Sequence, residues 1–306
     1  MWSSGVRHEL SFWHGHDRLS GDLRLPPTAG PHPVLLVVQE PGRDQSDYSA
    51  WLDAVARAGI ATFTWDRAGP RDESPGARRP VAHQAREVLS AVERLGRLPE
   101  LDVAAVALVG WGEGGWVAAQ AATYSNRIAA VILACTPAVV PTQADGHDPR
   151  PTLSALTVPV LALFGEQDPC VPLEGSVRGV RTALRDAGHL DHRVAVVRGA
   201  DHGLRVRAPH GLGPMVDGRH RFGDWPAGLT RLLVEWLDRR LRPDGVPSYA
   251  PPLEPALVAA TCPAPGPATP VPAPAPPDSV PARTASALAA LPAPVPVRQV
   301  RRRVAH

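Results

Sequence analysis

Hydrophobic and polar positions follow two patterns near the start of the chain. Residues 6–13 and 18–25 alternate apolar and polar side chains around a short polar turn, which predicts an antiparallel hairpin with one solvated face. Residues 34–38 are all valine or leucine, as expected of a strand that is buried on both faces.

The rest of the body alternates between apolar runs and helical spacing. The runs predict further strands at residues 60–65, 103–109, 129–134, 158–164 and 193–197. Between them, apolar residues recur at spacings of three and four from about Asp47, over residues 81–95 and over residues 229–237, which predicts helices there. Residues 114–124 and 177–187 are predicted as two further helices. This alternation predicts an α/β fold with a mostly parallel, twisted sheet and helices on both faces.

Proline marks the end of this pattern. Residues 243–306 hold 17 of the 36 prolines, interleaved mainly with alanine. Because proline has no backbone donor and fixes φ, this stretch is expected to form neither strands nor helices. We therefore predict one domain over residues 1–242 and a disordered Pro/Ala-rich tail over residues 243–306.

Composition and charge exclude several classes of protein. Apolar residues make up 44% of the chain and charged residues 20%, and the formal net charge of +2 gives no electrostatic argument for a nucleic-acid partner. No apolar run approaches the roughly 20 residues of a membrane-spanning helix. The first residues lack the basic and apolar regions of an export signal, so we expect a cytoplasmic location. The oligomeric state is left open.

Neither the cysteines nor the histidines of the predicted hairpin turn form a complete set of metal ligands. Cys135, Cys170 and Cys262 are widely spaced, with no C-x-x-C pair, and we expect them to be free thiols. His14 and His16 lie in the predicted hairpin turn without a third ligand, so a polar turn is the simpler interpretation. We expect neither a metal nor a cofactor.

A tight glycine-rich turn follows the strand at 103–109. A strand-to-helix turn needs small residues two positions on either side of its tip, because a larger side chain there would collide with the neighbouring backbone. Gly110 and Gly114 meet this need on either side of Gly112. The sequence therefore predicts that Gly112 lies at the tip, at the carboxyl edge of the sheet, where such folds place their active sites.

A carboxylate and an imidazole follow two later strands. Asp168 lies just past the strand at 158–164, and His202 lies in a glycine-flanked loop past the strand at 193–197. Asp201 is the neighbour of His202, but adjacent loop residues rarely face each other, so Asp168 is the preferred partner.

These three loops, in this order, resemble those of the α/β-hydrolase family. The likeness spans residues 18–241 and includes the stretch 66–69, followed by Ser74, which resembles the turn after the fourth strand of that family. A short connection between residues 134 and 158 makes the chain most similar to the uncapped, serine-aminopeptidase or dienelactone-hydrolase-like branch. The resemblance implies an α/β-hydrolase fold without a large cap domain, an esterase or peptidase ancestry, and a small-molecule ligand or substrate.

The chain departs from the family at the nucleophile. The family carries serine at the tip of the turn, and this chain carries Gly112. Without a hydroxyl, the route through an acyl-enzyme is removed.

A second departure concerns the backbone donor that faces the developing oxyanion. After its first buried strand the family has His-Gly and then the donor, where this chain places Pro41, which has no N–H. Losing one such donor typically costs about 3 to 4 kcal/mol in the transition state. Glu40 would add repulsion toward a negative oxygen, while a register shifted by one residue would make Gly42 the donor. The N–H of Glu113, at the start of the following helix, is the other candidate donor.

Two interpretations of the remaining residues stay open. In one, Asp168 orients His202 and raises its basicity, so that the imidazole takes a proton from water or substrate. In the other, both residues only hold loops in place. We hypothesise a degenerate Ser-Asp-His site with weak or no hydrolysis and a ligand-binding or interaction role. The alternative is an enzyme that uses the His202–Asp168 dyad for acid–base chemistry on a small carbonyl or ester substrate.

Other residues near the turn have simpler explanations than catalysis. The Glu113 carboxylate is expected to point away from the cleft and to interact with the helix dipole. Cys135 ends a strand at the same edge and is a candidate nucleophile, but cysteine is often buried as a small apolar residue. Trp111 and Trp116 flank the turn and fit core packing better than a pocket wall.

A minor alternative is dinucleotide binding. Gly110, Gly112 and Gly115 spell G-x-G-x-x-G between a strand and a helix. That motif requires an acid at the end of the next strand to hold the ribose. Cys135 and Thr136 occupy this place instead.

Overall fold

The structure is a computed structural model, and it describes residues 7–40, 49–66, 79–139, 147–206, 215–216, 219–220 and 225–242. Internal contacts divide the chain into residues 1–263 and 264–306, and every described residue belongs to the first unit. Pro41, Gly42, Ser74, Cys262 and the predicted tail lie outside the described residues.

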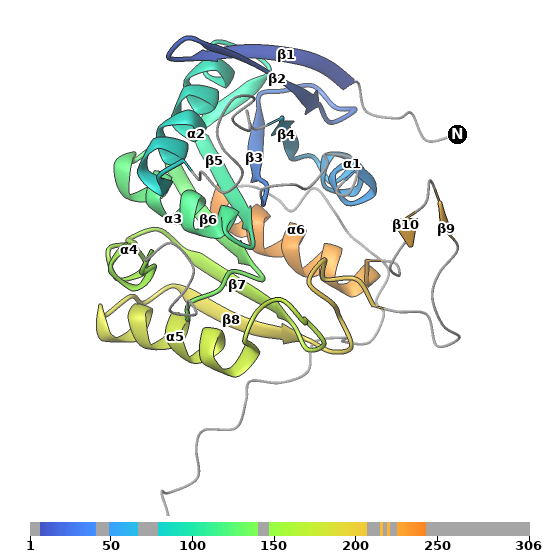
Figure 1. Cartoon of the computed structure of the whole chain (residues 1–306). Coiled ribbons are helices and arrows are strands. Elements are labelled where there is room, and N and C mark those ends of the chain that lie inside the picture. The colour runs from blue at the N-terminus through green and yellow to red at the C-terminus, as the bar shows by residue number, and fades with distance from the viewer. Residues whose placement is uncertain are drawn as a thin grey trace, which may run out of the picture. The chain divides into compact units, whose positions relative to one another are not determined.

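Eight strands form one sheet in the order β1-β2-β4-β3-β5-β6-β7-β8 (Figure 1). The first two strands form the predicted hairpin, β2 is also antiparallel to β4, and all other neighbours in this sheet are parallel. The strands are β1 (Arg7–His14), β2 (Asp17–Arg24), β3 (His32–Val38), β4 (Ala61–Trp65), β5 (Leu101–Trp111), β6 (Ile128–Ala134), β7 (Val160–Gly165) and β8 (His192–Val197).

Helices cover both faces of this sheet, as the alternating pattern predicts. The helices α2, α3, α4 and α5 lie on one face, and α1 and α6 lie on the other (Figure 1). Their bounds are α1 (Ser49–Arg57), α2 (Val81–Leu95), α3 (Gly114–Tyr124), α4 (Arg150–Ser154), α5 (Leu173–Asp186) and α6 (Ala227–Leu241). None of the described helices has the length and apolar character that crossing a bilayer requires.

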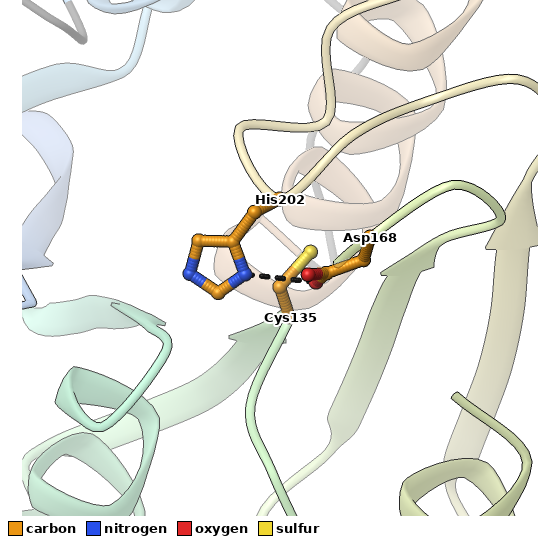
Figure 2. Close-up of side chains that lie close together, drawn as sticks. All are labelled: Cys135, Asp168 and His202. Atoms are coloured by element: carbon orange, nitrogen blue, oxygen red, sulfur yellow. Dashed lines mark hydrogen bonds and ion pairs between the residues drawn. The ribbon is translucent and has the colours of Figure 1, made fainter. Parts of the chain in front are cut away.

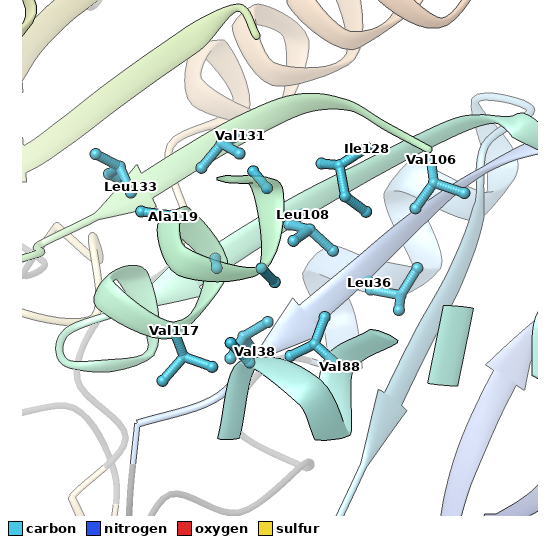
Figure 3. Packing of buried hydrophobic residues seen from close by; sticks show 14 of the residues in the cluster. Leu36, Val38, Val88, Val106, Leu108, Val117, Ala119, Ile128, Val131 and Leu133 are labelled. Atoms are coloured by element: carbon cyan, nitrogen blue, oxygen red, sulfur yellow. The ribbon is translucent and has the colours of Figure 1, made fainter. Parts of the chain in front are cut away.

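The core lies between the central strands and their covering helices. In β3, Leu36 and Val38 point to the α2/α3 face, and Leu35 and Val37 belong to the cluster on the α1/α6 face. Figure 3 shows the cluster on the α2/α3 face, in which Leu108 of β5 packs with residues of β6 and α3. Every residue of β3 is buried, which explains why residues 34–38 form a continuous apolar run rather than an alternating one.

Some elements differ from the prediction. The helix α5 begins at Leu173, four residues before the predicted start, because Glu174 and Gly175 in its first turn hide the apolar period. The hydrophobic pattern does not predict the short helix α4 or a two-stranded ribbon, because both are too short to show any periodicity. The ribbon pairs β9 (Met215–Val216) with β10 (Arg219–His220). The start of α1 predicted at Asp47 lies outside the described residues.

Candidate active site

The glycine-rich turn has the predicted geometry. β5 ends at Trp111 and α3 begins at Gly114, so the chain reverses direction around Gly112, whose φ is +51°. A Cβ on Gly110 would lie 2.3 Å from the carbonyl oxygen of Gly114, and a Cβ on Gly114 would lie 2.2 Å from that of Val38. Both distances are too short for real contacts, so the small residues on either side of the tip are needed to let β5, α3 and β3 pack together.

The Asp168 carboxylate is fixed in the loop after β7. Its Oδ1 accepts the backbone N–H groups of Cys170 at 2.7 Å and Val171 at 3.1 Å, and its Oδ2 accepts the Nδ1 proton of His202 at 2.8 Å. The side chain is only 1% exposed. These hydrogen bonds fix the orientation of both side chains at the edge of the sheet (Figure 2).

The His202 loop has its own supports. The carboxylate of Asp201 accepts the N–H groups of Gly203 at 2.8 Å and Arg205 at 3.0 Å, so it shapes the loop. The indole N–H of Trp111 donates to the carbonyl oxygen of His202 at 2.9 Å, tying the loop to the end of β5. Asp168, and not Asp201, is therefore the carboxylate that the imidazole contacts.

A second carboxylate holds the other side of the imidazole. The Nε2 of His202 donates to Oε2 of Glu40 at 3.1 Å, and Glu40 follows β3 almost directly. A Cβ on Gly112 would lie 2.6 Å from Oε1 of Glu40. The Glu40 carboxylate therefore fills the space into which a side chain at the tip would project.

Sequence reasoning names Glu40 only as a source of repulsion and misses this contact. The signal that could have found it is the register of the sheet, in which Val38 of β3 is level with Gly110 of β5. This register brings the residues after β3 to the turn, and a long side chain there reaches the space that glycine leaves.

The charge state of the site follows from these contacts. Burial alone would lower the pKa of His202, but the hydrogen bonds to Asp168 and Glu40 and their charges outweigh it and raise the pKa to about 9. Burial would raise the pKa of Asp168, but its hydrogen bond to His202 and the charge of the imidazolium bring the pKa below its ordinary value. Both partners of the ring are carboxylates, so both ring nitrogens donate.

Cys135 approaches the pair from the end of β6. Its Sγ lies with ligand atoms of Asp168 and His202 in a group whose members are all within 4.8 Å of one another (Figure 2). Burial and the Asp168 charge raise the pKa of the Cys135 thiol well above its ordinary value. The thiol is therefore protonated and a poor nucleophile.

A match to a protein-family model shows which family the chain belongs to. The model of the dienelactone hydrolase family matches residues 21–217. The chain belongs to the dienelactone hydrolase family. None of the curated proteins compared with the chain matches it.

Solved structures agree with the fold of the dienelactone hydrolase family. A Klebsiella pneumoniae protein named as a dienelactone hydrolase is 19% identical, with 78% of this chain and 100% of that chain covered and a TM-score of 0.63. The dienelactone hydrolase of Anabaena variabilis is 19% identical, over 78% of this chain and 100% of that chain, with a TM-score of 0.56. A promiscuous, dienelactone-hydrolase-like phosphotriesterase from metagenomic libraries is 19% identical, over 78% of this chain and 99% of that chain, with a TM-score of 0.59.

The remaining candidate residues in this family member are placed as follows. Trp111 is 1% exposed and Trp116 is 7% exposed, so both belong to the packed interior. Glu113 is the N-cap of α3. Pro41, the predicted defect in the oxyanion site, lies outside the described residues.

Among the described residues, Cys135, Asp168 and His202 form a group whose possible metal-ligand atoms all lie within 4.8 Å of one another. A metal bound through Nδ1 of His202 would have to break the 2.8 Å hydrogen bond to Oδ2 of Asp168, and one bound through Nε2 would have to break the 3.1 Å hydrogen bond to Glu40. These hydrogen bonds explain the arrangement without a metal ion.

Proposed function

We propose that this member of the dienelactone hydrolase family binds a small molecule beside Gly112 without forming an acyl-enzyme, and that its ester hydrolysis is weak or absent. The observation that carries this proposal is the hydrogen bond between Glu40 and Nε2 of His202, with the carboxylate in the space where a nucleophile would project.

The proposal is supported by what acyl transfer requires. An acyl-enzyme forms when a hydroxyl or thiol attacks the substrate carbonyl while a neutral imidazole takes its proton. Gly112 has neither group, and a pKa of about 9 keeps His202 protonated at neutral pH. The thiol of Cys135 lies beside Asp168, and its raised pKa opposes nucleophilic attack.

A fluorophosphonate probe and an ester assay test this proposal together. We expect no covalent adduct in the intact-protein mass spectrum and no burst of p-nitrophenol from p-nitrophenyl acetate. An adduct on the unmodified protein would mean that another hydroxyl acts as the nucleophile, and it would overturn the proposal.

A second candidate function is acid–base catalysis by the His202–Asp168 dyad on a small carbonyl or ester substrate. The observation that favours it is the partial exposure of Glu40. Its side chain is 26% exposed and contacts the His202 imidazole, which is 7% exposed, so a substrate that displaces the Glu40 carboxylate would reach Nε2 of the ring. Turnover without probe labelling, abolished by His202→Gln, would support this function over binding alone. Turnover that survives His202→Gln would exclude it.

A further inference from the structure

Two side chains that can donate or accept a proton, Glu40 and His202, lie in contact at the edge of the sheet. Oε2 of Glu40 is 3.1 Å from Nε2 of His202, and the other ring nitrogen donates to Asp168 at 2.8 Å. The three side chains form a chain of hydrogen bonds whose buried end is Asp168, at 1% exposure, and whose accessible end is Glu40, at 26%. Of the three side chains, the Glu40 carboxylate is therefore the one that solvent reaches most easily.

The roles of the two groups are opposite to those in a hydrolytic triad. A carboxylate can only accept a proton, and an imidazole ring that donates from both nitrogens can only give one. The acceptor at this site is thus Glu40, and the donor is His202. Asp168 holds the ring in place and keeps it charged.

This inference rests on the noncovalent site proposed above. We propose that the protein catalyses the enolisation of small ketones and lactones, with Glu40 as the general base and His202 as the general acid. Neither role needs a nucleophile at Gly112, and the reaction proceeds without cleavage of an ester bond.

The step balances without a further reactant. Glu40 takes the proton from the carbon next to the carbonyl, and the electron pair of that C–H bond forms the carbon–carbon double bond. The carbonyl π pair moves to oxygen, which replaces Oε2 of Glu40 as acceptor and receives the Nε2 proton of His202. Proton return to the same or a conjugated carbon, with the hydroxyl proton going back to His202, completes exchange or isomerisation.

The spacing of the groups suits such a ligand. A carbonyl oxygen and its α-carbon are two bonds apart, and the acid and base atoms of the site are 3.1 Å apart. The positive end of α3 lies beside Gly112, which favours negative charge on the carboxylate or on a developing enolate oxygen.

The test uses the full-length protein in D₂O with α-angelica lactone and hydroxyacetone, followed by ¹H NMR. We expect loss of the α-proton signal at a rate above that of buffer, and formation of the conjugated isomer of the lactone. General acid–base catalysis typically contributes 10²- to 10⁴-fold, so Glu40→Gln is expected to lower the exchange rate about 100-fold or more. Glu40→Asp should retain part of the rate, because it keeps a carboxylate on a shorter arm.

A matched control is Glu93→Gln, which makes the same change on the exposed surface of α2 and should leave the exchange rate unchanged. Thermal unfolding of each variant reports whether it is folded. If Glu40→Gln does not fold, Glu40→Asp and the pH profile of the unmodified protein carry the test.

The pH profile should show the titration of the acid. Within the described part of the chain, the groups that face His202 are Asp168, Glu40 and Cys135, from three different parts of the sheet edge. Exchange is expected to fall as the pH rises through about 9, where His202 loses its proton.

The outcomes separate the two proposals. No exchange with either compound, or exchange unaffected by Glu40→Gln, overturns enolisation and leaves noncovalent binding intact. Ring opening of the lactone through a covalent adduct overturns the noncovalent site itself.

Discussion

At the scale of single residues, the His202 ring lies between the carboxylates of Asp168 and Glu40, and the Glu40 carboxylate also lies next to Gly112. Asp168 and His202 could be predicted because each follows a strand whose carboxyl end must reach the same edge of a parallel sheet. Glu40 could not be assigned as the partner of His202, because the sequence does not give the direction of a side chain after a strand end.

Restoring a hydroxyl at the turn tests whether Glu40 blocks the position of the nucleophile. Gly112→Ser alone should leave hydrolysis of p-nitrophenyl acetate near background, because Glu40 still occupies Nε2 of His202 and its Oε1 lies 2.6 Å from the position of the new Cβ. Combining it with Glu40→Ala clears this contact and frees Nε2 of His202, so we expect a rate at least about tenfold higher than for Gly112→Ser alone. The variant Glu40→Ala alone gives the baseline rate of hydrolysis. Equal rates for Gly112→Ser and for the double variant would show that Glu40 does not block the position of the nucleophile.

The raised pKa of His202 also links stability to pH. The folded-state pKa of about 9 exceeds the ordinary value of 6.5, so this stabilisation is complete below pH 6.5 and is lost as the pH rises through about 9. A difference of this size corresponds to about 3 kcal/mol in the free energy of unfolding.

We expect urea unfolding of the wild type to show this loss between pH 6.5 and 9, and His202→Gln to show a much flatter dependence over the same range. The absolute stability of His202→Gln serves only as a reference, since the variant leaves two carboxylates close together. Parallel curves for the two proteins would contradict the raised pKa.

At the scale of elements, the hydrophobic pattern identifies the strands and the long helices, because their buried residues are apolar and their exposed residues are mostly polar. Residues 81–95 and 114–124 are predicted as helices with the bounds that the structure gives to α2 and α3. The five residues of α4 are too few to show a period, and its boundaries depend on contacts with α5 that the sequence does not display. The turn at Gly112 could be predicted because backbone atoms lie so close to Gly110 and Gly114 that only glycine fits there.

Gly110→Ala tests the packing of this turn. Its Cβ would lie 2.3 Å from the carbonyl oxygen of Gly114 and 2.4 Å from the Cα of Gly115, and backbone atoms cannot move aside cheaply. We expect a loss of about 3 kcal/mol or more in the free energy of unfolding.

The control for this change is Gly96→Ala, at the end of α2, where φ is −61° and the nearest atom is 3.3 Å from the added Cβ. This variant should differ from the wild type by less than about 1 kcal/mol. Similar thermal stability for the two variants in calorimetry would mean that β5, α3 and β3 are less tightly packed around the turn than the contacts indicate.

At the scale of the whole molecule, membership of the dienelactone hydrolase family covers residues 21–217 and agrees with the fold. The proline-rich composition predicts that residues 243–306 add nothing to the folded domain, and this stays a prediction. A chain that ends at Arg242 is expected to unfold within about 2 °C of the full-length protein in calorimetry. A larger decrease would show that the segment packs on the domain.

The account depends most on the state of one ring, His202 held between Asp168 and Glu40. ¹⁵N NMR of histidine-labelled protein measures this state directly. We predict that both ring nitrogens of His202 carry protons at neutral pH, that the ring titrates near pH 9, and that Glu40→Gln lowers this midpoint. A neutral ring at neutral pH, with a titration that Glu40→Gln leaves unchanged, would contradict the account.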